Sequence, residues 1–538
     1  MARSGARRRP GLGACGRCAR RLIRFLPSAS VLPSLLAGPV AYAAEFELRP
    51  TLTVGQYYTD NVSLAPRGLE QSDWVTMVTP GLIFNYNGAR LKFFATLSAD
   101  VIYRGNDSSV EVEPRYTGGT VGSMEIVDNL LYLDTNSTVS QQSTSAFGRQ
   151  ALNNVNTTDD RATVLTTRVS PYLRYFFGTD ASAEVRYSYT LVQSDAATGG
   201  SAGGSAAAAR GADSDGNRID VLLRSGPAYK RTTWTAHYYY DRVNYDLARD
   251  TTAQSISGGL RHLITPFVGL LANVGYEDNN YISTTTTPTG AFWSAGFDWN
   301  PSPRTQLAAT TGRRYYGPSH SFLFSHRTRL TVWNVRYSES ISSYRQQLLA
   351  PVGNSTADYL NTLNLTRIPD PVARQQAVND FIQTSGLPPT LFAPVTFFTN
   401  QFYLDKTWSA SVGLQGPRHT FFVNFFETSR ESQAAGLPDP GGDFSSASTV
   451  KQTGGGVVWT WRLTAVDSST MSAGYNRSET PGPVSREEIL KYLRVTYVHQ
   501  FSPKMSGSIN MHRLDNDSTS AGGSYLENQI SAQLQMRF

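Results

Sequence analysis

The chain ends in Gln529-Ile530-Ser531-Ala532-Gln533-Leu534-Gln535-Met536-Arg537-Phe538, and this stretch decides the fold. Apolar side chains occupy every second position from Ile530 to Phe538, with polar side chains between them. Successive side chains of a β-strand point to opposite faces, so the stretch predicts a strand with one apolar and one polar face. A final strand of this kind can pair with the first strand and close a barrel, which leaves no unpaired edge.

The same alternation recurs along the chain, for example in residues 90–103, 183–191 and 234–241. In each stretch one face suits lipid and the other suits water. The charged residues that we expect to line the lumen are Arg90, Lys92, Asp100, Glu184, Arg186, His237, Asp241 and Arg537. In an open lumen they would tune which solutes pass. The alternative is that they are polar only because any barrel interior is wet.

Turn signals separate these stretches, and short connections alternate with long ones along the chain. The short turns are expected at 87–88, 128–129, 178–180, 230–231, 265–266, 300–303, 326–329, 416–418, 462–466 and 502–503. Longer polar excursions lie between them, for example 60–73, 140–160, 194–217, 345–400 and 431–446. Ten turns and eleven loops predict an all-β, transmembrane, antiparallel up-and-down barrel of about 22 strands (18–22), with short periplasmic turns and long extracellular loops. A soluble β-sandwich is the alternative, but it would lack this rhythm.

The first 43 residues differ from the rest and predict a cleaved signal peptide. Eight arginines and no acidic residue precede an apolar stretch and an Ala41-Tyr42-Ala43 cleavage site. Arg20-Arg21 allows a twin-arginine signal as the alternative, but an outer-membrane barrel must cross the periplasm unfolded, which favours general secretion. The whole chain has 48 basic and 42 acidic residues, and without the eight arginines of the leader it has 40 basic and 42 acidic residues. The barrel region 44–538 therefore has no excess of positive charge with which to bind nucleic acid. Cys15 and Cys18 both lie in the leader, so the remainder has no thiol chemistry.

Several short motifs resemble the uncharacterised outer-membrane β-barrel proteins of the PEP-CTERM/exosortase protein-sorting system. They are Tyr58-Thr59-Asp60-Asn61-Val62 with Leu64-Ala65-Pro66, Thr79-Pro80-Gly81, Gly312 to Gly317, Ser325 to Arg329, Gly386-Leu387-Pro388-Pro389 and Phe398-Thr399-Asn400-Gln401. The resemblance implies the outer membrane of a Gram-negative bacterium that makes exopolysaccharide. It carries no catalytic or ligand residues, because the family name records genetic association and not mechanism.

This location implies particular partners. We expect contact with outer-membrane lipid and lipopolysaccharide, and with exopolysaccharide or its export machinery. The barrel assembly machinery is expected to recognise the terminal Phe538.

The excursion 345–400 contains a helix signal near 371–385. Asp370 is a plausible N-cap, Pro371 suits the first helical position, Ala377 and Phe381 share a face, and Gly386 ends the pattern. A loop of this length is usually functional or disordered. The helix could plug or gate the lumen, or it could cap the barrel from outside.

Sites for metals, cofactors and catalysis lack support in the sequence. The seven histidines do not have metal-ligand spacing. Asp213 to Asn217 begins like a calcium loop, but Arg218 stands where glycine is required, so a flexible acidic turn is the simpler interpretation. Ser325 and His326 are the residues that an enzyme could use, although such pairs arise by chance. We therefore expect no enzyme but a porin-like conduit or secretion component; the alternatives are a closed barrel whose loops bind polysaccharide or surface proteins, and a lipid-acting enzyme.

Overall fold

The computed structural model describes residues 45–538, except 106–113, 159, 197–212, 247, 285, 350–355, 366, 370, 389–391, 440–441, 446, 483–484 and 521. The expected signal peptide, 1–43, and the expected N-cap, Asp370, lie outside the described residues.

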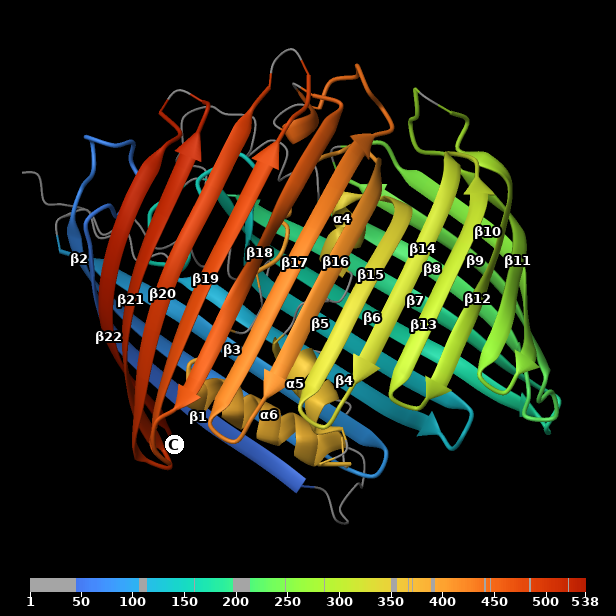
Figure 1. Cartoon of the computed structure of the whole chain (residues 1–538), viewed down its shortest axis with the longest axis horizontal. Coiled ribbons are helices and arrows are strands. Elements are labelled where there is room, and N and C mark those ends of the chain that lie inside the picture. Colours follow the sequence, from blue (N-terminus) through green and yellow to red (C-terminus); the bar gives the residue numbers. More distant parts are fainter. Residues whose placement is uncertain are drawn as a thin grey trace, which may run out of the picture.

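The described residues form one antiparallel sheet of 22 strands that closes on itself (Figure 1). The strands are β1 (Glu45–Thr59), β2 (Asp73–Asn87), β3 (Leu91–Arg104), β4 (Arg115–Val127), β5 (Leu131–Ser143), β6 (Arg161–Phe177), β7 (Ala181–Ala196), β8 (Ser214–Ser225), β9 (Thr232–Tyr245), β10 (Thr251–Thr265), β11 (Val268–Asn279), β12 (Thr289–Ser302), β13 (Thr305–Arg314), β14 (Gly317–Arg327), β15 (Thr331–Ser342), β16 (Tyr403–Gln415), β17 (His419–Ser432), β18 (Thr449–Arg462), β19 (Asp467–Glu479), β20 (Glu487–Ser502), β21 (Met505–Ser518) and β22 (Tyr525–Arg537). Each strand pairs with its neighbours in the chain, and β22 pairs with β1 from Thr51↔Arg537 to Thr59↔Gln529. The predicted up-and-down barrel and its strand number are confirmed.

The two faces of the wall differ as the alternation predicts. On β7, Tyr187 and Tyr189 are exposed on the outside, whereas Ser188 and Thr190 are buried on the inside. The terminal strand does the same, because Leu534 points outward and Ser531 points inward. Exposed large apolar side chains are found on nearly every strand, which produces the continuous apolar exterior that lipid requires. Among the described residues, no helix has both the length and the apolar character needed to cross a bilayer.

The connections follow the predicted alternation with one exception. Each of the ten short turns falls within a few residues of its expected place, at one end of the barrel. At the other end, the expectation that every connection is long is wrong between β13 and β14, where only residues 315–316 intervene. Gly317 follows them with φ +121°, a backbone conformation that glycine adopts without a steric penalty. The expected acidic turn at Asp213 to Asn217 is also wrong, because β8 begins at Ser214.

The longest connection, residues 343–402, contains three helices. They are α4 (Tyr344–Leu349), α5 (Thr356–Asn364) and α6 (Pro371–Ser385). The sequence indicated only α6, at these bounds. A 3-10 turn, η1 (Asp443–Ser445), lies in the connection between β17 and β18.

A buried carboxylate, Glu527, ties the barrel seam to the interior. It accepts hydrogen bonds from Thr59 Oγ1 on β1 at 2.7 Å and from Asn156 Nδ2 of the β5–β6 connection at 2.6 Å. We expect Glu527→Ala to lower the free energy of unfolding by about 3 kcal/mol, because it leaves buried donors without an acceptor. Urea titration of the protein in detergent checks this, with Gln533→Ala on the same strand face as the control. An equal effect of the two substitutions would contradict the role given to Glu527.

Candidate functional site

The connection 343–402 fills part of the lumen. Figure 1 shows α4 toward the end with the long connections, and α5 and α6 toward the end with the tight hairpins. Leu360 of α5 and Val378 of α6 pack against Val332, Phe422 and other inward-facing wall residues. Thr470 Oγ1 of β19 donates to the backbone oxygen of Ser385 at 2.6 Å, and the Arg462 guanidinium lies 5.6 Å from the centre of the Phe381 ring. The segment is therefore an internal plug, here called the lumen loop, and not an external cap.

A second connection, residues 144–160, also folds inward. Asn154 Nδ2 donates to Asp100 on β3 at 2.7 Å, and Asn156 reaches Glu527 on β22. Its other end is held by Asp443 of η1, which accepts hydrogen bonds from Ser145 Oγ at 2.6 Å and Ala146 N at 2.7 Å. Both connections thus lie in the interior and make polar contacts with the wall that they cover.

The wall is covered unevenly. On β17 to β22, inward-facing polar residues such as Thr428, Gln452 and Asn516 are completely buried, and Gln452 donates to the backbone oxygen of Val395 in the lumen loop. On β6 to β12, inward-facing ion pairs stay partly exposed: the side chain of Arg186 is 25% exposed, and that of Arg261 is 37% exposed. Partly exposed ion pairs on the inner face indicate water beside them. The inner face of β6 to β12 is therefore partly open to water, although α4 and Phe398 of the lumen loop pack on Ala162, Val164 and Val192 of β6 and β7.

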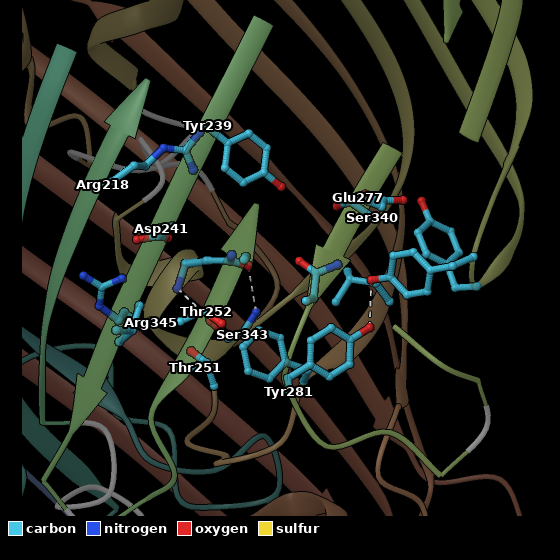
Figure 2. A pocket seen from close by; sticks show the side chains of 18 of the residues that line it. Arg218, Tyr239, Asp241, Thr251, Thr252, Glu277, Tyr281, Ser340, Ser343 and Arg345 are labelled. Atoms are coloured by element: carbon cyan, nitrogen blue, oxygen red, sulfur yellow. Dashed lines mark hydrogen bonds between the residues drawn. The ribbon is translucent and has the colours of Figure 1, made fainter. Parts of the chain in front are cut away.

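A cavity of about 140 Å³ lies on this uncovered side, toward the long connections (Figure 2). Strands β8 to β15 provide most of its wall, and α4 closes one side with Arg345. Figure 2 shows Arg345 next to Asp241 on one side, and Glu277 and Tyr281 on the other. Its charged lining residues are Arg218, Asp241, Glu277, Arg314 and Arg345, and its aromatic ones are Tyr239, Tyr245, Tyr281, Tyr315, Tyr316 and Phe402.

Two ion pairs shape the cavity. Arg314 Nη1 donates to Glu277 Oε2 at 2.9 Å, and Arg218 makes two hydrogen bonds to Asp220, at 2.7 and 2.8 Å. The Arg345 guanidinium donates to Thr190 Oγ1 and lies where a side chain at position 216 would otherwise be, so Gly216 makes room for it.

The aromatic side of the cavity is held by contacts between rings. Tyr281 stacks on Phe402 with ring centres 4.5 Å apart, and its hydroxyl shares a hydrogen bond of 2.7 Å with the Tyr315 hydroxyl. Burial raises the pKa of Tyr281 to about 12 and that of Tyr315 well above its ordinary value. Both phenols therefore keep their protons at physiological pH and remain hydrogen-bond donors.

The residues expected to line the lumen are distributed along the barrel. Asp241 lines the cavity. His237 lies 3.3 Å from Asp220 on the neighbouring strand. Glu184 and Arg186 are paired with each other at 3.2 Å, farther along the uncovered wall. The structure therefore brings only Asp241 into the cavity.

The remaining expected residues lie elsewhere. Asp100 holds the inserted connection 144–160, as described above. Arg90 lies in a short turn and pairs with Asp128 of the next short turn at 2.7 Å, so it belongs to the rim. Lys92 and Arg537 also lie near this rim, in the strand ends next to the short turns.

Three charged cavity residues, Arg218, Glu277 and Arg314, were not among those expected from the sequence to line the lumen. Their strands alternate, so the same parity argument could have placed them inside. Arg345 carries no such signal, because it belongs to a connection whose path depends on tertiary packing.

The alternative chemistries find no geometric support. Ser325 and His326 are consecutive in β14, so their side chains point to opposite faces of the wall and cannot act as a pair. Across the described part of the chain, no group of three or more His, Cys, Asp or Glu side chains is placed to hold a metal ion.

Neither a protein-family model nor a curated protein matches this chain. Among solved structures, it is similar to the siderophore receptor PirA from Acinetobacter baumannii (9% identity, TM-score 0.47, 91% of this chain and 80% of the other). It is also similar to the FrpB iron transporter from Neisseria meningitidis (8% identity, TM-score 0.45, 91% of this chain and 82% of the other). A third similar structure is OpdK from Pseudomonas aeruginosa, solved with vanillate (8% identity, TM-score 0.33, 91% of this chain and 99% of the other). Similarities this distant say nothing about the ligand of this chain.

Ion selectivity can be tested at Arg168. This residue is exposed on the inner face of β6, close to Arg218, Arg345, Asp220 and Asp241. Because the cluster carries one more positive than negative charge, we expect Arg168→Gln to lower the anion-to-cation permeability ratio about twofold. Reversal potentials in a KCl gradient measure this. Arg242→Gln, on the outer face of β9, is the control, and an equal shift in both variants would contradict the assignment.

Docking of the connection 144–160 should depend on pH. Burial raises the pKa of Asp443 from 3.8 to about 6, with Arg486 and Asp439 as the nearby charged groups. The docked state therefore binds a proton more readily than the undocked state, and docking weakens as pH rises from about 4 to 6. Hydrogen exchange of amides 144–160 should show stronger protection at pH 5 than at pH 7.5. After correction for the intrinsic pH dependence of amide exchange, Asp443→Asn should show equal protection at the two pH values. A difference in protection that persists in this variant would refute the assignment.

Proposed function

We propose that this chain is a Gram-negative outer-membrane barrel that acts as a porin-like conduit, after cleavage of residues 1–43. The continuous apolar exterior and the closed sheet support the membrane location, because every backbone group of the wall can be paired within the sheet. Passage would be passive, through the water beside the lumen loop.

The uneven cover of the wall carries this proposal. If the inserted connections closed the lumen, inward-facing ion pairs all around the barrel would be buried. Arg186 and Arg261 instead keep a quarter or more of their side chains exposed. Charged walls along such a passage are the usual means of solute selection in barrels.

The proposed cargo follows from the sequence motifs. Their resemblance to the PEP-CTERM/exosortase-associated proteins supports a conduit or secretion component for exopolysaccharide or its surface proteins. The partners would be outer-membrane lipid and lipopolysaccharide, the barrel assembly machinery and the polysaccharide export machinery. A closed barrel whose loops bind extracellular polysaccharide is the second candidate, favoured by the two connections that occupy the interior.

Planar-bilayer conductance tests the proposal. We expect the purified barrel to give stable single channels, and deletion of residues 346–398 to raise their conductance several-fold, because the lumen loop occupies part of the cross-section. Circular dichroism and size-exclusion chromatography in detergent establish that the deletion variant folds. Absence of current before and after deletion would contradict a conduit and favour the closed barrel.

Cross-linking the lumen loop separates a passage beside it from a passage that opens when it leaves. Ser385→Cys with Thr470→Cys places two thiols where the loop contacts the wall. We expect oxidation to leave the conductance within about twofold, because the passage lies on the other side. The two single-cysteine variants are the controls. If oxidation abolished the current and reduction of the disulfide restored it, the lumen loop itself would be the gate.

A further inference from the structure

We infer that the cavity between β8 to β15 and α4 is a saccharide subsite that takes one neutral sugar ring. This inference deepens the proposed conduit function, since the passage would deliver the sugar. It rests on the cavity's size, its unpaired polar atoms, its charge balance and its aromatic lining.

The size and position fit a single ring. Each water molecule needs roughly 10–15 Å³ of cavity volume, so this cavity of about 140 Å³ holds on the order of ten waters. That is close to the number of non-hydrogen atoms in one hexose unit. The cavity lies on the uncovered side of the lumen, so a sugar in the passage would reach it without displacing the lumen loop.

Unpaired polar atoms in the cavity call for a ligand that donates hydrogen bonds. Glu277 is only 4% exposed, and its Oε1 has no hydrogen-bond partner within the described structure. Asp241 receives no hydrogen bond from any described residue either, although its carboxylate lines the same cavity. A buried carboxylate oxygen without a donor is costly, and sugar hydroxyls supply such donors. Arg345 Nε, also unpaired, could donate to a sugar oxygen.

The charges favour a neutral ligand. An anion would find only Arg345 without a carboxylate partner, because Arg218 is engaged by Asp220 and Arg314 by Glu277. The carboxylates of Asp241 and Glu277 would also repel an anion. A cation would meet three guanidinium groups in the same lining. A neutral molecule that is rich in hydroxyls meets neither penalty.

The aromatic residues supply flat apolar surfaces for the C–H face of a sugar ring. Five tyrosines and Phe402 line the cavity. Tyr281 is fixed by its stacking on Phe402 and by its hydrogen bond to Tyr315, so little side-chain entropy is lost on binding. Apolar walls with a few placed polar groups are the usual form of a small-molecule site.

Saturation-transfer NMR and calorimetry on the purified protein in detergent test the subsite. The probes are glucose, galactose, mannose and maltose, with inorganic phosphate and lysine as the anionic and cationic comparisons. We expect at least one neutral sugar to bind, and Asp241→Asn and Glu277→Gln each to weaken its binding about tenfold. Asp241 makes no hydrogen bond to a described residue, so its variant should fold even if Glu277→Gln does not.

The matched control is Asp298→Asn. Asp298 forms an ion pair of 2.6 Å with Arg261 on the same uncovered wall, outside the cavity, and this variant should bind sugar as the unmodified protein does. Tighter binding of phosphate or lysine, no sugar binding, or equal weakening by Asp298→Asn would overturn the inference. Channels without sugar binding would overturn only the subsite. Sugar binding without channels would overturn only the conduit.

Discussion

The pairing of β1 with β22 is the interaction on which the rest of this structure depends. It converts a sheet with two open edges into a wall in which backbone donors and acceptors find partners, the condition for a β-sheet in hydrocarbon. The seam is reinforced by side chains: Thr59 donates to Glu527, Asp60 accepts two hydrogen bonds from Asn528, and Asn61 donates to the backbone of Leu526. Closure also fixes which face of every strand points inward.

A closed wall of 22 strands encloses more space than its own side chains fill, and this explains the inserted connections. The lumen loop and residues 144–160 lie largely against β17 to β22, where they contact polar wall residues, and α4 of the lumen loop also packs on β6 and β7. The other side keeps its ion pairs in water, and the cavity lies there. The proposed conduit and the proposed sugar subsite would therefore be two consequences of one asymmetry, in which the loops stabilise the interior without closing it.

Much of the fold could be predicted from the sequence because local rules decide it. Alternation assigned the faces of β3, β7, β9 and β22, and the turn signals located the ten hairpins. The two-residue connection at 315–316 was missed, because nothing local distinguishes a tight turn at the loop end from a longer loop. Most of the candidate site could not be predicted from the sequence. The alternation of β9 placed Asp241 on the inner face, but α4 and α5 are too short to show a helical period. Only tertiary packing brings Arg345 to β8.

A cysteine pair across the seam tests the central claim most directly. Val54 of β1 faces Leu534 of β22, and the barrel region contains no natural cysteine. With Val54→Cys and Leu534→Cys, the account predicts an intramolecular disulfide in protein folded in detergent or lipid, seen as a mobility change that reduction reverses. Val54→Cys with Ile530→Cys, four residues out of register, should not cross-link. Failure of the first pair, or equal cross-linking of both pairs, would contradict closure in this register.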